Sequence, residues 1–367
     1  MGKRESFRSV LIFGGAGFIG SNWAHRLLES TEAKVHIFDN LSRSGSRHNL
    51  AHLQKIAGKS GRLQITIGDT RDQAMVMRAA KHATEIYQFA AQVAVTTSVV
   101  DPRLDFDVNA AGTFNVLEAA RQSGNRPFVL FTSTNKVYGD FVSHDVGEQA
   151  KRYFSPASEG IDESQPLDFH SPYGCSKGAA DQYVRDYARI FDLPTVVFRM
   201  SCIAGPRQFG NEDQGWVAHF LYSALLRRSI TIYGTGKQVR DVLAVEDLLN
   251  GFEFAWANRD KTAGRVYNIG GGKVNNISLL ELLDEIERRT RVRPDCEFVP
   301  ARPGDQLIYV SNHAAFTRDT QWRPARNVSD VLDSIHAWYR GNREVFAAQK
   351  VTTIPVPTEV EPVLRAA

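Results

Sequence analysis

Short apolar runs alternate with segments of helical periodicity along the first half of the chain. Runs of this length fit strands that are buried on both faces of a parallel sheet, and the segments between them fit the helices that cover those faces. The pattern therefore predicts an α/β fold with a doubly wound parallel sheet. The predicted strands are 10–13, 35–38, 63–67, 85–89, 127–131 and 195–198, and the predicted helices are 22–28, 72–80, 104–122 and 173–191.

The alternation loosens after Phe198, where residues 199–210 are rich in glycine, proline and polar side chains. Such a stretch suits a crossing into a second, smaller α/β region, which we expect to bind the substrate. We expect Asp213 to cap a helix that runs from about Gly215 to Arg228. Two further segments, 279–286 and 328–338, are predicted to be amphipathic helices. The predicted domains are a first domain at 1–198 with a returning segment near 240–270, and a second region at 199–239 and 271–346. Residues 347–367 are predicted to form a flexible tail.

Composition narrows the functional classes. The 367 residues carry a net charge of +3, and their lysines and arginines are scattered, which argues against a nucleic-acid partner. Each apolar run is far shorter than the roughly 20 residues that span a membrane. Cys175, Cys202 and Cys296 lack the spacing of metal ligands, so no metal site is predicted. We expect reduced thiols in a cytoplasmic protein.

The first predicted strand runs into the glycine-rich segment 14–20, which has the pattern Gly-x-x-Gly-x-x-Gly and precedes a helix. Glycines at such a turn let the backbone approach a pyrophosphate, and the helix N-terminus supplies N–H donors. The next strand ends at Asp39, whose carboxylate can accept hydrogen bonds from an adenosine ribose and would repel a 2′-phosphate. NAD is therefore favoured as the cofactor, while Arg43 and Arg47 leave NADP open.

Polar or small residues stand at the ends of several predicted strands. Asp39, Asp69, Ala90 and Thr134 each follow an apolar run. Ligands of doubly wound sheets bind at the C-terminal ends of the strands. We therefore expect these four positions to lie around one site.

Tyr173 and Lys177 are four residues apart in a predicted helix, so their side chains share one face. An ammonium group close to a phenol favours the phenolate and lowers the pKa of the tyrosine. We therefore predict that Tyr173 accepts a proton from a substrate hydroxyl, with the Thr134 hydroxyl bound to the same oxygen.

Several motifs together resemble the extended short-chain dehydrogenases/reductases that modify nucleotide sugars. The resemblance implies NAD as cofactor, a homo-oligomer built by helix packing, and an active-site set of Thr134, Tyr173 and Lys177. It implies further cofactor contacts at Gly14, Gly17, Phe18, Ile19, Asp39, Asn40, Arg43, Asp69, Thr70, Ala90, Gln92, Asn109 and Thr132, and substrate contacts at Asn135, Trp216, Arg240 and Arg302. The motifs are Gly14-Gly15-Ala16-Gly17-Phe18-Ile19-Gly20, Asp39-Asn40-Leu41-Ser42-Arg43, Val137-Tyr138-Gly139, Tyr173-Gly174-Cys175-Ser176-Lys177 and Arg240-Asp241-Val242.

Within that family, the segments 133–140, 167–183, 213–217 and 236–243 resemble the CDP-tyvelose (CDP-paratose) 2-epimerases. The related 4,6-dehydratases carry Asp-Glu after the active-site threonine, whereas this chain has Asn135 and Lys136. Without that pair of carboxyl groups, elimination of water has no obvious general acid. The resemblance therefore implies inversion of C2 of a nucleoside-diphosphate sugar through a transient 2-keto sugar.

Three other readings stay open at this point. The enzyme could be a nucleotide-sugar 4-epimerase or a 2-epimerase of another nucleoside-diphosphate hexose, because the orientation of the bound sugar determines which carbon reacts. A catalytically silent NAD-binding sensor on the same fold is the third reading, although a sensor has no need of Thr134, Tyr173 and Lys177.

Overall fold

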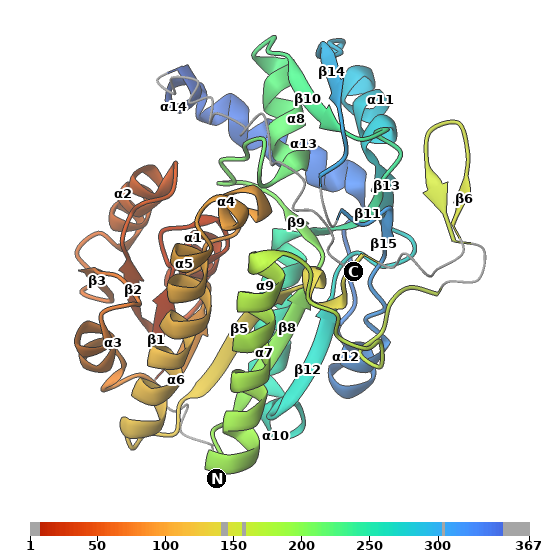
Figure 1. Cartoon of the computed structure of the whole chain (residues 1–367). Coiled ribbons are helices and arrows are strands. Elements are labelled where there is room, and N and C mark those ends of the chain that lie inside the picture. The colour runs from red at the N-terminus through yellow and green to blue at the C-terminus, as the bar shows by residue number, and fades with distance from the viewer. Residues whose placement is uncertain (1–7, 141–145, 156–158, 303–304, 348–367) are drawn as a thin grey trace.

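The computed structural model describes residues 8–347 apart from 141–145, 156–158 and 303–304. Its central feature is a sheet of seven parallel strands in the order β12-β8-β5-β4-β1-β2-β3 (Figure 1). The predicted doubly wound sheet is confirmed. The strands are β1 (Ser9–Phe13), β2 (Lys34–Asp39), β3 (Leu63–Ile67), β4 (Glu85–Gln88), β5 (Phe128–Thr134), β8 (Thr195–Met200) and β12 (Arg265–Ile269).

Alternate residues of β1 enter the two cores on opposite faces of the sheet. Val10 and Ile12 pack with Trp23 and Phe252, while Leu11 and Phe13 pack with side chains on the other face. One face is covered by α1 (Phe18–Ser30), α2 (Ser46–Ala57) and α9 (Val245–Ala257), and the other by α3 (Gln73–Ala80), α6 (Gly112–Gln122) and α7 (Ser171–Phe191).

Helix α7 is tied to the sheet by a buried ion pair. Both guanidinium bonds from Arg199 on β8 to the carboxylate of Asp181 on α7 measure 2.9 Å. The two side chains are 4% and 0% exposed. Because a buried carboxylate without its partner is costly, this pair fixes how α7 lies on the sheet. The helix begins at Ser171, slightly before the predicted start.

The long helix predicted over 104–122 is interrupted, which corrects that prediction. The chain instead forms α5 (Pro102–Phe106), the π-helix η1 (Asp107–Ala111) and then α6. The wide π turn carries Asn109, whose side chain bonds the main chain of Gln92 in both directions, at 2.9 and 3.0 Å. A π turn of this kind commonly marks a functional site.

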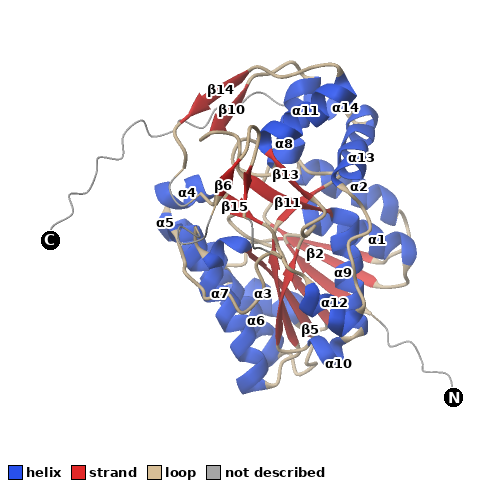
Figure 2. Cartoon of the chain, turned by 90° about the vertical axis from the view of Figure 1, so that its right-hand side faces the viewer, coloured by secondary structure: helices blue, strands red, loops and turns tan. Residues whose placement is uncertain are grey.

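The second region forms its own core beside the C-terminal edge of the large sheet (Figure 2). Its centre is β11 (Val239–Ala244), which pairs with β13, β15 and β9. Leu221, Leu282 and Leu332 pack its helices together. The elements are β9 (Cys202–Ala204), β10 (Ile230–Tyr233), β13 (Asn276–Ser278), β14 (Cys296–Val299), β15 (Ile308–Tyr309), α8 (Trp216–Leu225), α11 (Leu279–Thr290), α13 (Val328–Gly341) and α14 (Arg343–Ala347).

Helix α8 begins where it was predicted to begin, but its cap and its C-terminal end differ from the prediction. Its N-cap is Gly215, which has a left-handed φ of 74° and no capping side chain, and the helix ends at Leu225. Asp213 is not the cap, because its carboxylate pairs with Arg302 at 3.2 Å instead.

The domain division stays a prediction, and residues 348–367 of the predicted tail lie outside the described residues. Phe316 and Trp322 pack into the core beside α9. Among the described helices, none is long and apolar enough to cross a membrane. The remaining elements are α4 (Val95–Val100), α10 (Arg259–Thr262), α12 (Ala314–Thr320), the 3-10 helix η2 (Asn135–Tyr138), β6 (Gly147–Glu148) and β7 (Tyr153–Phe154).

Candidate active site

A cavity of about 840 Å³ lies where the C-terminal strand ends of the sheet face the second region. It opens at the point where the strand order reverses between β1 and β4, which is where doubly wound sheets bind ligands. Most of the predicted site residues line it. They are Gly14, Gly17, Phe18, Ile19, Asp39, Asn40, Arg43, Asp69, Thr70, Ala90, Gln92, Thr132, Thr134, Asn135, Tyr173, Lys177, Trp216 and Arg302.

Two glycines of the turn between β1 and α1, Gly14 and Gly20, have no room for a side chain. Gly14 has a φ of 74°, and a Cβ there would lie 2.7 Å from the main-chain nitrogen of Ala90. A Cβ on Gly20 would lie 2.3 Å from the carbonyl oxygen of Gly14. The bare backbone and the first amides of α1 form one wall of the cavity, as a bound pyrophosphate requires.

Two carboxylates at neighbouring strand ends differ in their electrostatics. Asp39 accepts hydrogen bonds from the main-chain nitrogens of Ala16 at 2.9 Å and Leu41 at 2.8 Å. Burial raises the pKa of Asp39, while these amide bonds oppose the rise. Hydrogen bonds from Arg71 lower the pKa of Asp69 to about 2, so the Asp69 carboxylate is ionised at neutral pH. Both carboxylates can accept hydrogen bonds from the hydroxyl or amino groups of a dinucleotide.

Arg43 points across the cavity mouth and donates to the side-chain oxygen of Gln214 in the second region. Its guanidinium group therefore links the two halves of the cavity wall. Arg47 is exposed on α2. With the Asp39 carboxylate at the end of β2, this arrangement fits NAD, the favoured cofactor of the sequence prediction.

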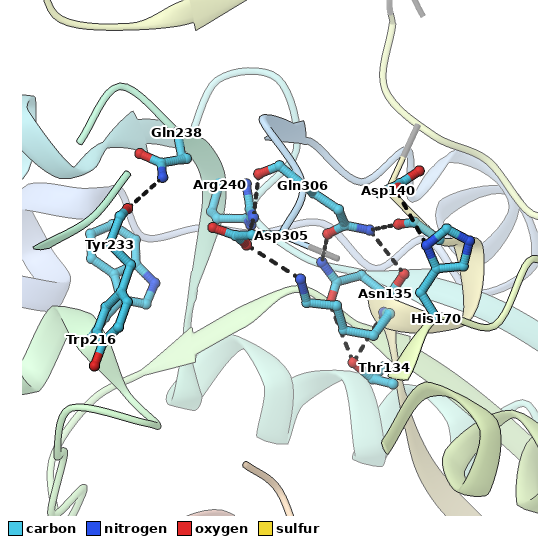
Figure 3. Close-up of polar contacts among 12 residues, drawn as sticks. Thr134, Asn135, Asp140, His170, Trp216, Tyr233, Gln238, Arg240, Asp305 and Gln306 are labelled. Carbon is cyan, nitrogen blue, oxygen red and sulfur yellow. Dashed lines mark hydrogen bonds and ion pairs between the residues drawn. The ribbon is translucent and has the colours of Figure 1, made fainter. Parts of the chain in front are cut away.

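Two of the predicted residues lie behind the cavity wall. Asn109 holds the main chain of Gln92, which does line the cavity. Arg240 is 8% exposed and donates to Asp305 at 2.9 Å and to the carbonyl of Gln306 at 2.6 Å (Figure 3). Their observed contacts support neighbouring segments of the site.

Thr134 at the end of β5 and Tyr173 in the first turn of α7 both line the cavity, and the Thr134 hydroxyl opposes the rise in the pKa of Tyr173. Lys177, one turn along α7, donates to the carbonyl of Thr132 at 2.6 Å and lies 4.1 Å above the ring centre of Phe131. The three groups predicted to act together are therefore assembled at one wall.

The predicted effect of Lys177 on the pKa of Tyr173 is wrong for the protein without its cofactor. Burial raises the pKa of Tyr173 to about 12, and the charges that act on it are Asp105 and Arg43. Burial lowers the pKa of Lys177 to about 7. A shared helix face fixed the positions of the two side chains, but the ammonium group turned to a main-chain oxygen of β5.

The far end of the cavity holds a cluster of charges. Lys136 lies 3.4 Å from the carboxylate of Asp305, which also binds Arg240 (Figure 3). Trp216 lines the same end and donates to the sulfur of Cys202 at 3.2 Å. Arg302 stacks on Tyr233, with its Cζ 3.8 Å from the ring centre.

The amide of Gln306, which is fully buried and bonds Asn135 at 3.0 Å, was not among the predicted site residues. Arg207 and Cys202 in the cavity wall were not predicted either. Local spacing carries no signal for these residues, because none of them belongs to the glycine turn or to α7.

Comparisons with known proteins agree with this site. Residues 10–270 match the NAD dependent epimerase/dehydratase family. A CDP-paratose 2-epimerase of Salmonella typhi is 43% identical over 337 residues, which are 90% of this chain and 98% of that protein. A dTDP-glucose 4,6-dehydratase of Salmonella typhimurium is 29% identical over 91% of this chain and 93% of its own.

The structure of the Thermus thermophilus UDP-glucose 4-epimerase in complex with NAD is 30% identical and superimposes with a TM-score of 0.76, covering 91% of this chain and 99% of that one. The predicted family is thus confirmed: the chain belongs to the NAD-dependent epimerase/dehydratase family, and NAD is its cofactor.

Proposed function

We propose that the protein inverts C2 of a nucleoside-diphosphate sugar, of the type that converts CDP-paratose to CDP-tyvelose. The likeness to the Salmonella typhi enzyme supports the substrate class. The observation that carries the reaction type is the pair Asn135 and Lys136, which follows Thr134 at the cavity wall. Neither position carries the carboxyl group that elimination of water would use as acid or base, and this favours reversible oxidation of one carbon.

The carboxylate nearest to Lys136 is also unsuited to act as an acid. Burial alone would raise the pKa of Asp305, but Arg240 and Lys136 together lower it below its usual range. Asp305 therefore stays ionised at neutral pH and has no proton to give to a leaving hydroxyl. The charge cluster favours an epimerase over a dehydratase.

In the proposed reaction, Tyr173 as its phenolate accepts the proton of the C2 hydroxyl and later returns it to the C2 oxygen. NAD, when bound, supplies the reversible two-electron oxidation of C2. The Thr134 hydroxyl, which opposes the rise in the pKa of Tyr173, orients the reacting oxygen. Lys177, on the same face of α7 as Tyr173, binds the ribose of the cofactor in this proposal. The 2-keto sugar then rotates in the pocket to present its opposite face, while its nucleotide remains bound.

Arg302 is the proposed ligand of the substrate diphosphate, with Trp216 as a neighbouring wall of the pocket. The guanidinium group now pairs with Asp213 at 3.2 Å. A diphosphate offers oxygens to both edges of the guanidinium plane, so it can replace the single carboxylate. Arg240 would support this end of the site from behind, through Asp305.

The proposal is tested by NMR of the purified protein incubated with CDP-, UDP-, GDP- and ADP-linked hexoses. We expect inversion at C2 of CDP-paratose and no change in the other sugars. Inversion at C4 would replace the proposal by the 4-epimerase reading. NAD binding without turnover of any sugar would favour the NAD sensor, which the assembled Thr134 and Tyr173 otherwise argue against.

A homodimer through α6 and α7 is a further part of the proposal. The two helices lie side by side over one face of the sheet (Figure 1). Their outer surface exposes Phe114, Tyr183, Ile190 and Phe191, which are 40–65% exposed. A patch of this kind on neighbouring helices favours an isologous interface. The cytoplasmic location stays a prediction from the sequence.

Tyr183→Glu is therefore expected to convert the dimer to a monomer, because the interface would bury the new carboxylate opposite the same carboxylate of the second subunit. Light scattering coupled to gel filtration measures the mass directly. Val274→Glu is the matched control, since Val274 is 88% exposed in a turn of the second region. A Tyr183→Glu protein that keeps the mass of the parent would exclude this interface.

A further inference from the structure

A fully buried carboxylate lies behind the part of the cavity wall that Gln92 forms. Asp105 on α5 is 0% exposed, and its Oδ1 accepts hydrogen bonds from Nε2 of Gln92 at 3.0 Å and from Nδ2 of Asn109 at 3.1 Å. Its Oδ2 accepts a hydrogen bond from the hydroxyl of Ser176, the residue before Lys177 on α7. One carboxylate therefore joins the cavity wall to the first turns of α7.

Main-chain groups fix the two amides so that only donors face Asp105. Oε1 of Gln92 accepts from the main-chain N–H of Ala94 at 2.6 Å, and Oδ1 of Asn109 accepts from the main-chain N–H of Gln92 at 2.9 Å. A main-chain N–H only donates, so the amino group of each amide is turned to the carboxylate. Hydrogen bonds donated to a carboxylate favour its ionised form. Burial raises the pKa of Asp105, and the hydrogen bonds from Ser176 and Gln92 oppose that rise.

No cation bonds the Asp105 carboxylate in the part of the chain that the structure describes. Asp181 is also fully buried, but its carboxylate binds the guanidinium group of Arg199 through two bonds of 2.9 Å. The charge of Asp181 is therefore balanced within its own ion pair. Asp105 has only neutral donors, so its charge remains to act on the ionisable groups nearby.

The Asp105 charge acts on Tyr173 and on Lys177 in the same direction. Burial raises the pKa of Tyr173 to about 12, and Asp105 adds to this rise while Arg43 opposes it. Burial lowers the pKa of Lys177 to about 7, and Asp181 and Asp105 oppose this fall. A nearby negative charge disfavours a phenolate and favours an ammonium group, so both pKa values are higher with Asp105 ionised.

We propose that Asp105 is a positioning residue that holds the first turns of α7 against the cavity wall and serves as the counter-charge of the Lys177 ammonium group. This inference rests on the roles that the proposed function gives to Tyr173 and Lys177, and it deepens them. With Asp105 ionised, the phenolate of Tyr173 is a stronger base toward the sugar hydroxyl. Lys177 also keeps its proton to a higher pH for the ribose of NAD.

Asp105→Asn removes the charge and keeps the hydrogen bonds. The Oδ1 of the asparagine can accept from both amides. Its Nδ2 can donate to Oγ of Ser176, whose hydrogen then turns to the main-chain carbonyl of Tyr173 at 3.2 Å. The variant therefore separates the charge of Asp105 from its part in the packing.

The first measurement is the dependence of kcat on pH in the NAD-loaded enzyme. A phenolate beside an ammonium group is the singly deprotonated form of the pair, so kcat should fall on both sides of an optimum. Both limbs should move to lower pH by about one unit in Asp105→Asn, because the lost charge raised the pKa of both groups. The variant should then be about tenfold faster than the parent on the acid limb and about tenfold slower on the alkaline limb.

The second measurement needs no sugar. In the cofactor-free protein, Lys177 makes the free energy of unfolding rise with pH above about 7, because the unfolded chain binds its proton and the folded chain does not. In Asp105→Asn this rise should begin about one pH unit lower, as urea denaturation at a series of pH values will show. The displacement should vanish when Lys177→Met is present in both proteins.

Asp107→Asn is the matched control, because Asp107 lies two residues along the chain and its carboxylate pairs at 2.7 Å with Arg103, which is 84% exposed. Neither the kcat profile nor the free energy of unfolding of this variant should move along the pH axis. Should Asp105→Asn fail to fold, Asp105→Ser removes the same charge and leaves a hydroxyl that accepts from the amides of Gln92 and Asn109.

Three results would overturn the proposal. The first is a kcat profile of Asp105→Asn that stays in place on the pH axis, whether or not it is lower at every pH, because a purely structural role predicts that result. The second is a free energy of unfolding with the same pH dependence in Asp105→Asn and its parent. The third is an equal displacement in Asp107→Asn. A parent protein that turns over no nucleotide sugar would instead refute the proposed function, and the unfolding measurements would still test the counter-charge.

Discussion

Tyr173→Phe is expected to lower kcat by about a thousandfold while leaving NAD bound. Transfer of a proton by a positioned side chain contributes roughly a hundredfold to ten-thousandfold to a rate, and phenylalanine has no proton to transfer. The ring itself stays, so the packing of the first turn of α7 is kept. Epimer formation followed by NMR gives kcat, and the nicotinamide released by acid extraction gives the NAD content.

Tyr183→Phe, on the same helix but 50% exposed on the outer surface, is the matched control for loss of a phenol. Its kcat should stay within about twofold of the parent, as expected for a surface group remote from the reaction. Turnover of Tyr173→Phe within about tenfold of the parent would remove Tyr173 as the carrier of the proton. Loss of NAD from Tyr173→Phe would instead mean that the phenol acts mainly on the cofactor.

The parallel sheet and the place of the cavity could be predicted because both follow from local patterns. A strand buried on both faces is a continuous apolar run, as in 10–13 and 128–131. The end of such a run marks the C-terminal edge of the sheet. Asp39, Thr134 and the glycine turn therefore had to converge once the strands were parallel.

The direction in which side chains point could not be predicted from the sequence pattern. The four-residue spacing placed Tyr173 and Lys177 on one face, but it carried no information about the carbonyl of Thr132 or the ring of Phe131, which hold the ammonium group. Burial of Tyr173 itself raises the pKa of its phenol, which is the reverse of the expected effect. The π turn at 107–111 was hidden in the same way, because its asparagine bonds the main chain of another segment.

The contact between Asn135 and Gln306 had no sequence signal. Asn135 and Gln306 are 171 positions apart, and an isolated glutamine beside an aspartate is an ordinary surface pattern. Their contact exists because β15 pairs with β11 and brings the segment before it under β5 and η2. Contacts of this separation follow from the assembled fold and not from local propensity.

Lys177→Met is expected to abolish most turnover and yet to stabilise the cofactor-free protein. The pKa of Lys177 falls from 10.5 to about 7 because burial penalises the ammonium group. A fall of this size corresponds to about 4 to 5 kcal/mol. The carbonyl of Thr132 would lose its donor, which costs about 1 to 3 kcal/mol. A net gain of about 2 kcal/mol in the free energy of unfolding remains, measured by urea denaturation below about pH 7.

The gain should fade as the pH rises. Between pH 7 and 10.5 the unfolded chain binds the lysine proton and the folded chain does not, so the parent protein gains stability with rising pH in this window. Below pH 7 both states are protonated and the penalty is complete. Above 10.5 neither state is protonated, and the advantage of the variant is gone.

Lys261→Met is the control, because Lys261 is exposed on α10 and its replacement should change the free energy of unfolding by less than about 0.5 kcal/mol. A Lys177→Met protein less stable than its parent at about pH 6 would mean that the bonds to Thr132 and Phe131 outweigh burial. Greater stability with lost turnover would show a buried lysine that is kept for its chemistry at a cost in stability. That pattern is typical of active sites, where function and stability compete for the same side chain.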